Sequence, residues 1–141
     1  MLIPRYTGIF LDKGEIFEKF PPKLSVTPGH LHVTLSFRGG IESAHEEFLG
    51  EVVKVRVVGY GNDGKNEGLK VELESTNPEL QKICDELEAP HITLSVSRDA
   101  RNRDTRNLAF EPLEEPLEFV GRYGVFTPSG LVLYNKSNYG G

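Results

Sequence analysis

The chain has 141 residues, of which one is cysteine, one is methionine and none is tryptophan. Because a disulfide or a cysteine-based metal site needs a second thiol, the lone Cys84 excludes both within the chain. We interpret it as a small apolar residue on a helix. The apolar runs have the length of a strand, far short of the roughly 20 residues that a membrane-spanning helix needs, and no secretory apolar segment opens the chain. These absences predict a soluble cytoplasmic protein with no membrane partner.

Positive charge is also in short supply, with 16 Lys and Arg against 21 Asp and Glu and a net charge of -5. This balance disfavours a nonspecific grip on a long phosphate backbone, so any nucleic-acid partner should be a nucleotide or a short RNA. The hydrophobic fraction of 38% is typical of soluble globular proteins. The length fits a single domain over residues 1–141, and the oligomeric state is left open.

Strand-like segments dominate the chain, while helical signals are few. The clearest helix is expected at 78–87, where Asn77 can cap it and Pro78 suits its first position. Weaker helices are expected at 15–20 and 43–49. The sequence predicts an α+β domain with more sheet than helix. Its expected strands are 6–11, 30–37, 51–60, 69–75, 91–97, 117–127 and 131–134.

Two connections carry specific expectations. The sequence Gly-Asn-Asp-Gly at 61–64 is typical of a hairpin turn, because these residues tolerate positive φ, so the flanking strands should be antiparallel neighbours. The segment 98–115 holds four arginines and little apolar content, which indicates a functional loop.

The most informative feature is a five-residue motif that occurs twice. The motifs His-Val-Thr-Leu-Ser at 32–36 and His-Ile-Thr-Leu-Ser at 91–95 agree in residue type at every position. Alternate residues of a strand project from the same face, at a spacing of about 7 Å, so histidine, threonine and serine should share one face of each strand. Two such polar faces lining one cleft would surround a phosphate.

This pairing suits phosphodiester cleavage, which needs a base on the attacking side and an acid on the leaving side. Histidine titrates near neutrality, so His32 and His91 can divide the two roles. The hydroxyls of Thr34 and Thr93 can donate hydrogen bonds to the nonbridging phosphate oxygens. We expect these four residues to be catalytic, with no metal and no cofactor. The identity of the base depends on how the substrate is oriented.

The paired motifs resemble those of the 2H phosphoesterase superfamily, which includes proteins similar to 2′-5′ RNA ligases and cyclic phosphodiesterases. The stretch Ala-Pro-His-Ile-Thr-Leu at 89–94 is especially similar to the P-H-[ILV]-T-L pattern of that group. The resemblance implies a bilobal fold of two antiparallel sheet-based halves around a central cleft. It also implies metal-independent activity on 2′,3′-cyclic phosphates, 2′-5′ linkages or cyclic oligonucleotides. The sequence departs from the group at 14–28, where a proline-broken segment replaces a long helix.

Two further residues are candidate substrate ligands. Arg98 follows the second motif and offers a bidentate guanidinium to phosphate, or else a solvated charge paired with a loop aspartate. Tyr6 on the first expected strand is the preferred aromatic for stacking a base. His30 and His45 are expected to have structural or solvent-exposed roles.

Three hypotheses follow from the sequence. The first is a nucleotide phosphodiesterase, and the second is a noncatalytic nucleotide-binding module that uses the same cleft. The third is a small β-rich interaction domain in which the two motifs are merely similar strands. Only the third predicts that His32 and His91 lie far apart or on different surfaces.

Overall fold

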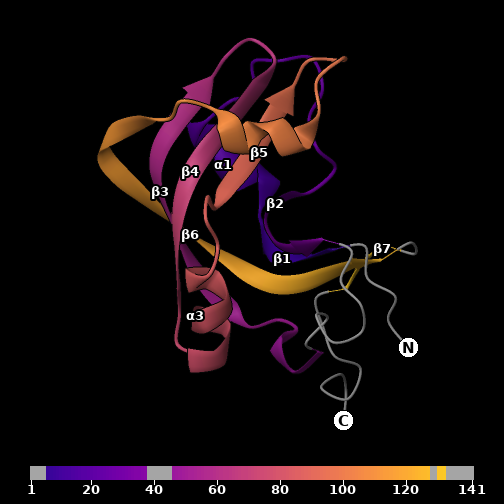
Figure 1. Cartoon of the computed structure of the whole chain (residues 1–141), viewed down its shortest axis with the longest axis vertical. Coiled ribbons are helices and arrows are strands. Elements are labelled where there is room, and N and C mark those ends of the chain that lie inside the picture. Colours follow the sequence, from indigo (N-terminus) through magenta and orange to yellow (C-terminus); the bar gives the residue numbers. More distant parts are fainter. Residues whose placement is uncertain (1–5, 38–45, 128–129, 133–141) are drawn as a thin grey trace.

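One antiparallel sheet organises the protein. A computed structural model describes residues 6–37, 46–127 and 130–132, and the seven strands found there form a single sheet (Figure 1). The strand order is β2-β1-β6-β3-β4-β5, and β7 pairs with β6. The strands are β1 (Tyr6–Leu11), β2 (Leu31–Phe37), β3 (Val52–Asn62), β4 (Asn66–Ser75), β5 (His91–Val96), β6 (Glu111–Thr127) and β7 (Gly130–Val132). The helices are α1 (Lys13–Lys19) and α3 (Pro78–Asp85), with 3-10 turns η1 (Glu46–Phe48) and η2 (Asn102–Asn107).

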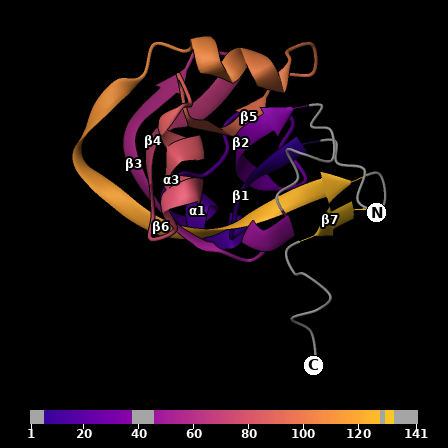
Figure 2. The same ribbon diagram turned by 60° about the horizontal axis from the view of Figure 1, so that its bottom comes forward.

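The sheet curls until its two end strands, β2 and β5, approach each other and nearly close a barrel (Figure 2). Two backbone hydrogen bonds between Val26, which precedes β2, and Val96, the last residue of β5, join the two ends at 2.9 and 2.8 Å. The two motif strands are therefore neighbours in space, although half of the domain separates them in sequence.

Alternation along the central strands builds the core. Val53, Val55 and Val57 of β3 are fully buried, and the residues between them are exposed. The helices contribute Ile16 from α1 and Cys84 from α3 to the same core. Burial raises the pKa of the Cys84 thiol to about 11, so the thiol stays protonated and inert. The predicted apolar role of this cysteine is confirmed.

The helices form where local signals place them. The Asn77 side chain accepts hydrogen bonds from the first turn of α3, as predicted, and the helix ends two residues before its expected boundary. Asp12 caps α1 in the same way through the backbone N–H of Glu15. Of the helix expected at 43–49, residues 43–45 lie outside the described residues, and only the short η1 follows.

The predicted hairpin is confirmed, since β3 and β4 are antiparallel neighbours joined through Gly64, whose φ is 86°. The prediction of a continuous loop at 98–115 is wrong, because η2 lies within it and β6 already begins at Glu111. Proline has no backbone N–H to donate to a sheet ladder. Pro112 and Pro116 therefore argue against a strand in the sequence, and the first part of β6 was not predicted. In the structure Pro112 pairs with Gly59 beside an irregularity in the β3–β6 register.

The predominance of antiparallel sheet over helix agrees with the predicted class. The strands form one continuous sheet, and the bilobal arrangement around a cleft stays a prediction. Within the described ranges, none of the helices has the length and apolar character needed to cross a membrane.

Candidate active site

The first motif lies on β2 and contains an extra residue. Thr34 pairs with Gly8 of β1, and Ser36 pairs with the next residue back, Thr7, so that Leu35 has no partner in the register. An unpaired residue of this kind is a β-bulge, which changes the alternation of side chains beyond it. The regular run of faces predicted for this strand is therefore interrupted directly after the threonine.

The second motif, on β5, has its bulge at the equivalent position. Thr93 pairs with Gly68 of β4, Ser95 pairs with Glu67, and Leu94 is the extra residue. Ser95 is fully buried and its Oγ donates to Glu67 Oε1 at 2.6 Å. The prediction that the serine shares the polar face is wrong for Ser95, because the bulge turns it towards the buried Glu67.

Each motif threonine pairs with a glycine of the neighbouring strand. A larger residue at either glycine would have to push the backbone of the motif strand aside. A Cβ at Gly8 would lie 2.7 Å from the carbonyl oxygen of Val33, and a Cβ at Gly68 would lie 2.8 Å from that of Ile92. Val33 and Ile92 are the middle residues of the two histidine-x-threonine motifs. The repeated motif in the sequence thus corresponds to a repeated local structure, in which a bulge, a glycine and a close backbone contact occur together.

The two histidines are held in the same way. Nδ1 of His32 donates to the carbonyl oxygen of His30 at 3.0 Å, and Nδ1 of His91 donates to that of Ala89 at 2.8 Å. A carbonyl only accepts, so the proton of each neutral ring resides on Nδ1 and Nε2 is left as an acceptor. Both rings are therefore fixed in the tautomer that can take a proton at Nε2.

The two rings lie close enough for their charges to interact. Burial lowers the pKa of His32 from its ordinary value of 6.5, and the charges of His30 and His91 lower it further. Burial likewise lowers the pKa of His91, and the Arg106 guanidinium adds to this effect. The bond from each ring to a backbone carbonyl opposes these shifts. At neutral pH both rings are therefore mainly uncharged, with the acceptor capacity that a base needs.

Thr93 belongs to a hydrogen-bond network beneath η2. Its hydroxyl bonds to Oγ1 of Thr105 at 2.9 Å and to the carbonyl oxygen of Asn102 at 3.3 Å. Thr105 is fully buried, and its Oγ1 accepts from Nδ2 of Asn66 at 3.1 Å. The amide of Asn66 also donates to the carbonyl oxygen of Arg101 at 2.7 Å. This network positions the Thr93 hydroxyl, whereas Thr34 lies half-buried on the face of His32.

Tyr6 supports His32 directly. Its ring stacks on the imidazole with centroids 4.7 Å apart and an interplanar angle of 25°, and on Phe126 with centroids 5.2 Å apart. Phe10 packs against the same imidazole at 5.4 Å. The aromatic rings displace water from His32, which explains why burial is the main cause of its lowered pKa. Stacking of Tyr6 on a base stays a prediction.

The arginine nearest to a motif histidine is not the one that the sequence favoured. Arg98 lies exposed beyond the last residue of β5, whereas His91 is the first, so about 20 Å of strand separates them. Arg106, an exposed residue of η2, acts instead on the pKa of His91. Lys70 pairs with His91 across the β4–β5 ladder and adds a second cation. Sequence spacing gave no indication that η2 returns Arg106 to this strand.

The ring of His30 lies beside the pair. His30 is exposed, as expected, and meets the rings of Phe10 and Phe126 edge-on. Its backbone carbonyl, rather than its ring, holds His32. His45 lies outside the described residues.

No family model and no curated protein matches this chain. The resemblance to 2H phosphoesterases therefore depends on the two motifs and stays a prediction.

Proposed function

We propose that the protein is a metal-independent phosphodiesterase that acts on a nucleotide by paired-histidine acid/base catalysis. The observation that carries the proposal is the shared arrangement of His32 and His91, whose strands contact each other and whose rings are each fixed by the carbonyl two residues before them. His91 also lies near enough for its charge to lower the pKa of His32. Two imidazoles with Nε2 free and close together suit one phosphate held between them. The bilobal arrangement of the 2H phosphoesterases is part of this proposal.

In the proposed reaction one imidazole removes a proton from water or from a ribose hydroxyl as that oxygen attacks phosphorus. The other histidine, protonated at Nε2, gives its proton to the leaving oxygen as the P–O bond breaks. One ring thus gains the proton that the other loses, and exchange with water restores both. The Thr34 hydroxyl donates to one nonbridging oxygen, and the Thr93 hydroxyl donates to another by turning its single proton away from the Asn102 carbonyl.

The cations beside His91 favour an anionic substrate. Arg106 and Lys70 both carry positive charge at this end of β5. A bound phosphate raises the pKa of the nearby imidazoles, because an opposite charge stabilises the protonated ring. The substrate itself therefore supplies the condition under which one histidine becomes the acid.

The proposed substrates are small. They are 2′,3′-cyclic phosphate ends, 2′-5′ linkages and cyclic oligonucleotides, in line with the net charge of -5. The acidic chain disfavours binding of long RNA. Arg106 and Lys70 form a small positively charged region, which suits a single phosphate group.

A noncatalytic nucleotide-binding module is the second candidate. The lowered pKa of both His32 and His91 favours it, because a receptor needs neutral hydrogen-bonding rings and no charged acid. The β-rich interaction domain predicts distant histidines, and both the contact between β2 and β5 and the effect of His91 on the pKa of His32 argue against it.

A turnover screen separates these candidates. The panel is a set of 2′,3′-cyclic mononucleotides, 2′-5′ dinucleotides and cyclic dinucleotides in excess EDTA, followed by ³¹P NMR. The proposal expects one class to be converted, with the spectrum showing whether phosphate remains on the 2′ or the 3′ oxygen. Saturable binding without conversion of any member supports the receptor instead.

A further inference from the structure

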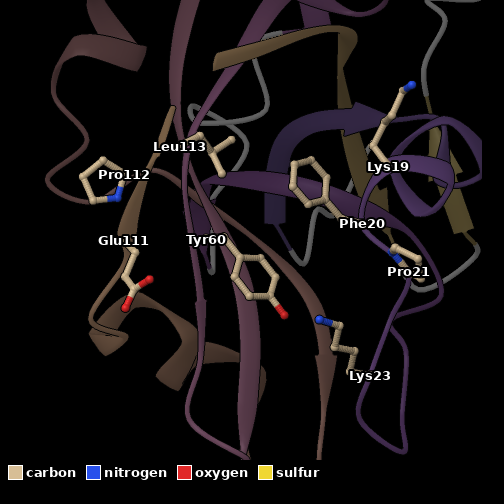
Figure 3. Close-up of a pocket in the computed structure, with 8 residues that line it drawn as sticks. All are labelled: Lys19, Phe20, Pro21, Lys23, Tyr60, Glu111, Pro112 and Leu113. Carbon is tan, nitrogen blue, oxygen red and sulfur yellow. The ribbon is translucent and has the colours of Figure 1, made fainter. Parts of the chain in front are cut away.

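A cavity of about 300 Å³ lies away from the histidine pair, between the end of α1 and the paired strands β3 and β6 (Figure 3). Tyr60 in its wall pairs with Leu69, and Leu69 pairs with Ile92. Directly paired residues project from the same face of a sheet. Tyr60 is therefore on the face of the buried Leu69 and Ile92, whereas His91 projects from the opposite face. The cavity and the candidate active site are separated by the sheet.

Two aromatic rings face the cavity. Phe20 and Tyr60 are nearly parallel, with an interplanar angle of 12° and ring centroids 6.4 Å apart. Because this distance joins the ring centroids, the two ring planes are at most 6.4 Å apart. Two van der Waals contacts of about 3.5 Å place the outer rings of a three-ring stack roughly 7 Å apart, so Phe20 must move outwards to admit a flat ring. Pro112 and Leu113 add apolar surface (Figure 3). The walls suit a planar, weakly polar group.

The Tyr60 side of the cavity is ordered before any ligand binds. The Tyr60 hydroxyl donates to the carboxylate of Glu67, which is fully buried. The same carboxylate accepts the backbone N–H of Lys23 at 3.0 Å and the hydroxyl of Ser95 at 2.6 Å. A ligand therefore meets a fixed ring and a fixed backbone, which lowers the entropy that binding must overcome.

Charge in the cavity is distributed unevenly. The Lys23 ammonium lies 5.5 Å from the centroid of the Tyr60 ring, and Lys19 is a second cation of the wall. The carboxylate of Glu111 lies on the far side, with Pro112 (Figure 3). An anionic group on the ligand is accordingly favoured at Lys23, while the ring occupies the space between Phe20 and Tyr60.

We propose that this cavity is a second ligand site, which binds a small planar ring carrying an anionic group, such as a nucleoside monophosphate. Its volume is at the lower end of the range for small-molecule sites, about 300 to 1,000 Å³, and so suits one ring system with one short substituent. The site is separate from the histidine pair, because Tyr60 and its strand partner Glu111 lie on the opposite face of the sheet from His91.

The absence of tryptophan provides a direct assay. The variant Phe20→Trp keeps an aromatic wall and introduces a single indole, whose fluorescence reports stacking. Adenosine 5′-monophosphate should quench it with saturation. Adenosine, which lacks the anion, and ribose 5-phosphate, which lacks the ring, should bind more weakly.

Lys23→Gln in the reporter background should weaken binding of the monophosphate by about five- to tenfold, the loss of one charge-assisted contact. Lys54→Gln is the matched control, because Lys54 is an exposed lysine of β3 outside the cavity wall. It should leave the affinity unchanged. An equal loss of affinity in both variants would overturn the proposal, because it would show that the monophosphate is attracted by the overall charge of the protein.

His91→Ala in the same background keeps this proposal separate from the proposed function. The second-site proposal expects unchanged quenching whether or not His91 is present. Loss of quenching with His91→Ala would place the nucleotide at the histidine pair and overturn it. Equilibrium dialysis of the unmodified chain against the monophosphate provides the measurement that needs no reporter, and no retention up to millimolar ligand also contradicts the proposal.

Discussion

Gly68 and Thr105 are packed so closely that a Cβ on the glycine would lie 2.3 Å from Cγ2 of the threonine. Gly68 is also the residue opposite Thr93 in the β4–β5 ladder. The absence of a side chain at this position lets η2 approach the sheet, and η2 carries both Thr105 and Arg106 to the second motif. One glycine thus positions both the hydroxyl network and the arginine whose charge acts on His91.

Gly68→Ala should therefore destabilise the fold and displace η2. The new Cβ meets Thr105 and the backbone carbonyl of Ile92, neither of which can move cheaply. Overpacking of this kind costs about 1 to 3 kcal/mol in the free energy of unfolding, measured by urea denaturation. Gly29→Ala is the control, since a Cβ there has no neighbour within 4 Å. Equal stability of the two variants would refute the packing argument.

Thr105→Val should affect the position of Thr93 more than the core. Valine keeps the volume of threonine but removes the oxygen that bonds to Thr93 and Asn66. We expect a loss of about 1 to 3 kcal/mol in unfolding free energy and a fall in kcat. Thr105→Ser, which keeps the hydroxyl, should restore most of the kcat even where stability stays reduced. A valine variant with unchanged kcat would show that this bond has no role in turnover.

Arg106→Gln should change both substrate binding and the titration of His91. Removing the cation takes away a cause of the lowered pKa, so the pKa of His91 should rise towards 6.5, as observed by NMR of the imidazole ring. KM for an anionic substrate should increase about 5- to 50-fold. Arg98→Gln, at the far end of β5, should leave both quantities unchanged. The opposite result would restore Arg98 as the phosphate ligand.

The pH dependence of kcat/KM should be bell-shaped with its maximum below pH 6.5. This ratio reports the free enzyme, in which one histidine must be deprotonated and the other protonated. Burial lowers the pKa of both His32 and His91 from 6.5, so both limbs of the curve shift to acidic pH. The rate should fall on the alkaline side as the acid loses its proton. A maximum above pH 6.5 would mean that another group is the acid.

The sequence predicted the motif strands and the hairpin of β3 and β4 well, because alternation, turn residues and caps are local signals. Asn77 and Gly64 occupy the cap and turn that their chemistry favours. The bulges at Leu35 and Leu94 were not predictable in this way, since they arise from the register with another strand. The strict alternation assumed for Ser95 failed for that reason.

The sequence singled out the four motif residues of the candidate site, whose catalytic role stays a prediction, but it gave no sign of the residues that support them. Thr105 acts through a contact between segments that only the folded chain brings together, and Arg106 looked like any other exposed loop arginine. Tyr6 was singled out for stacking on a base, yet its contacts are with His32 and Phe126. Side-chain roles of this kind depend on tertiary packing and leave no periodic trace in the sequence.

The most direct test of the central claim compares His32→Ala, His91→Ala and the double variant on the substrate that the screen identifies, in EDTA, with folding checked by circular dichroism. Since the two imidazoles act as one unit, each single variant should lose about 100- to 10,000-fold in kcat, and the double variant should be little worse than the slower single one. Full activity of either single variant, with the fold retained, would contradict the account.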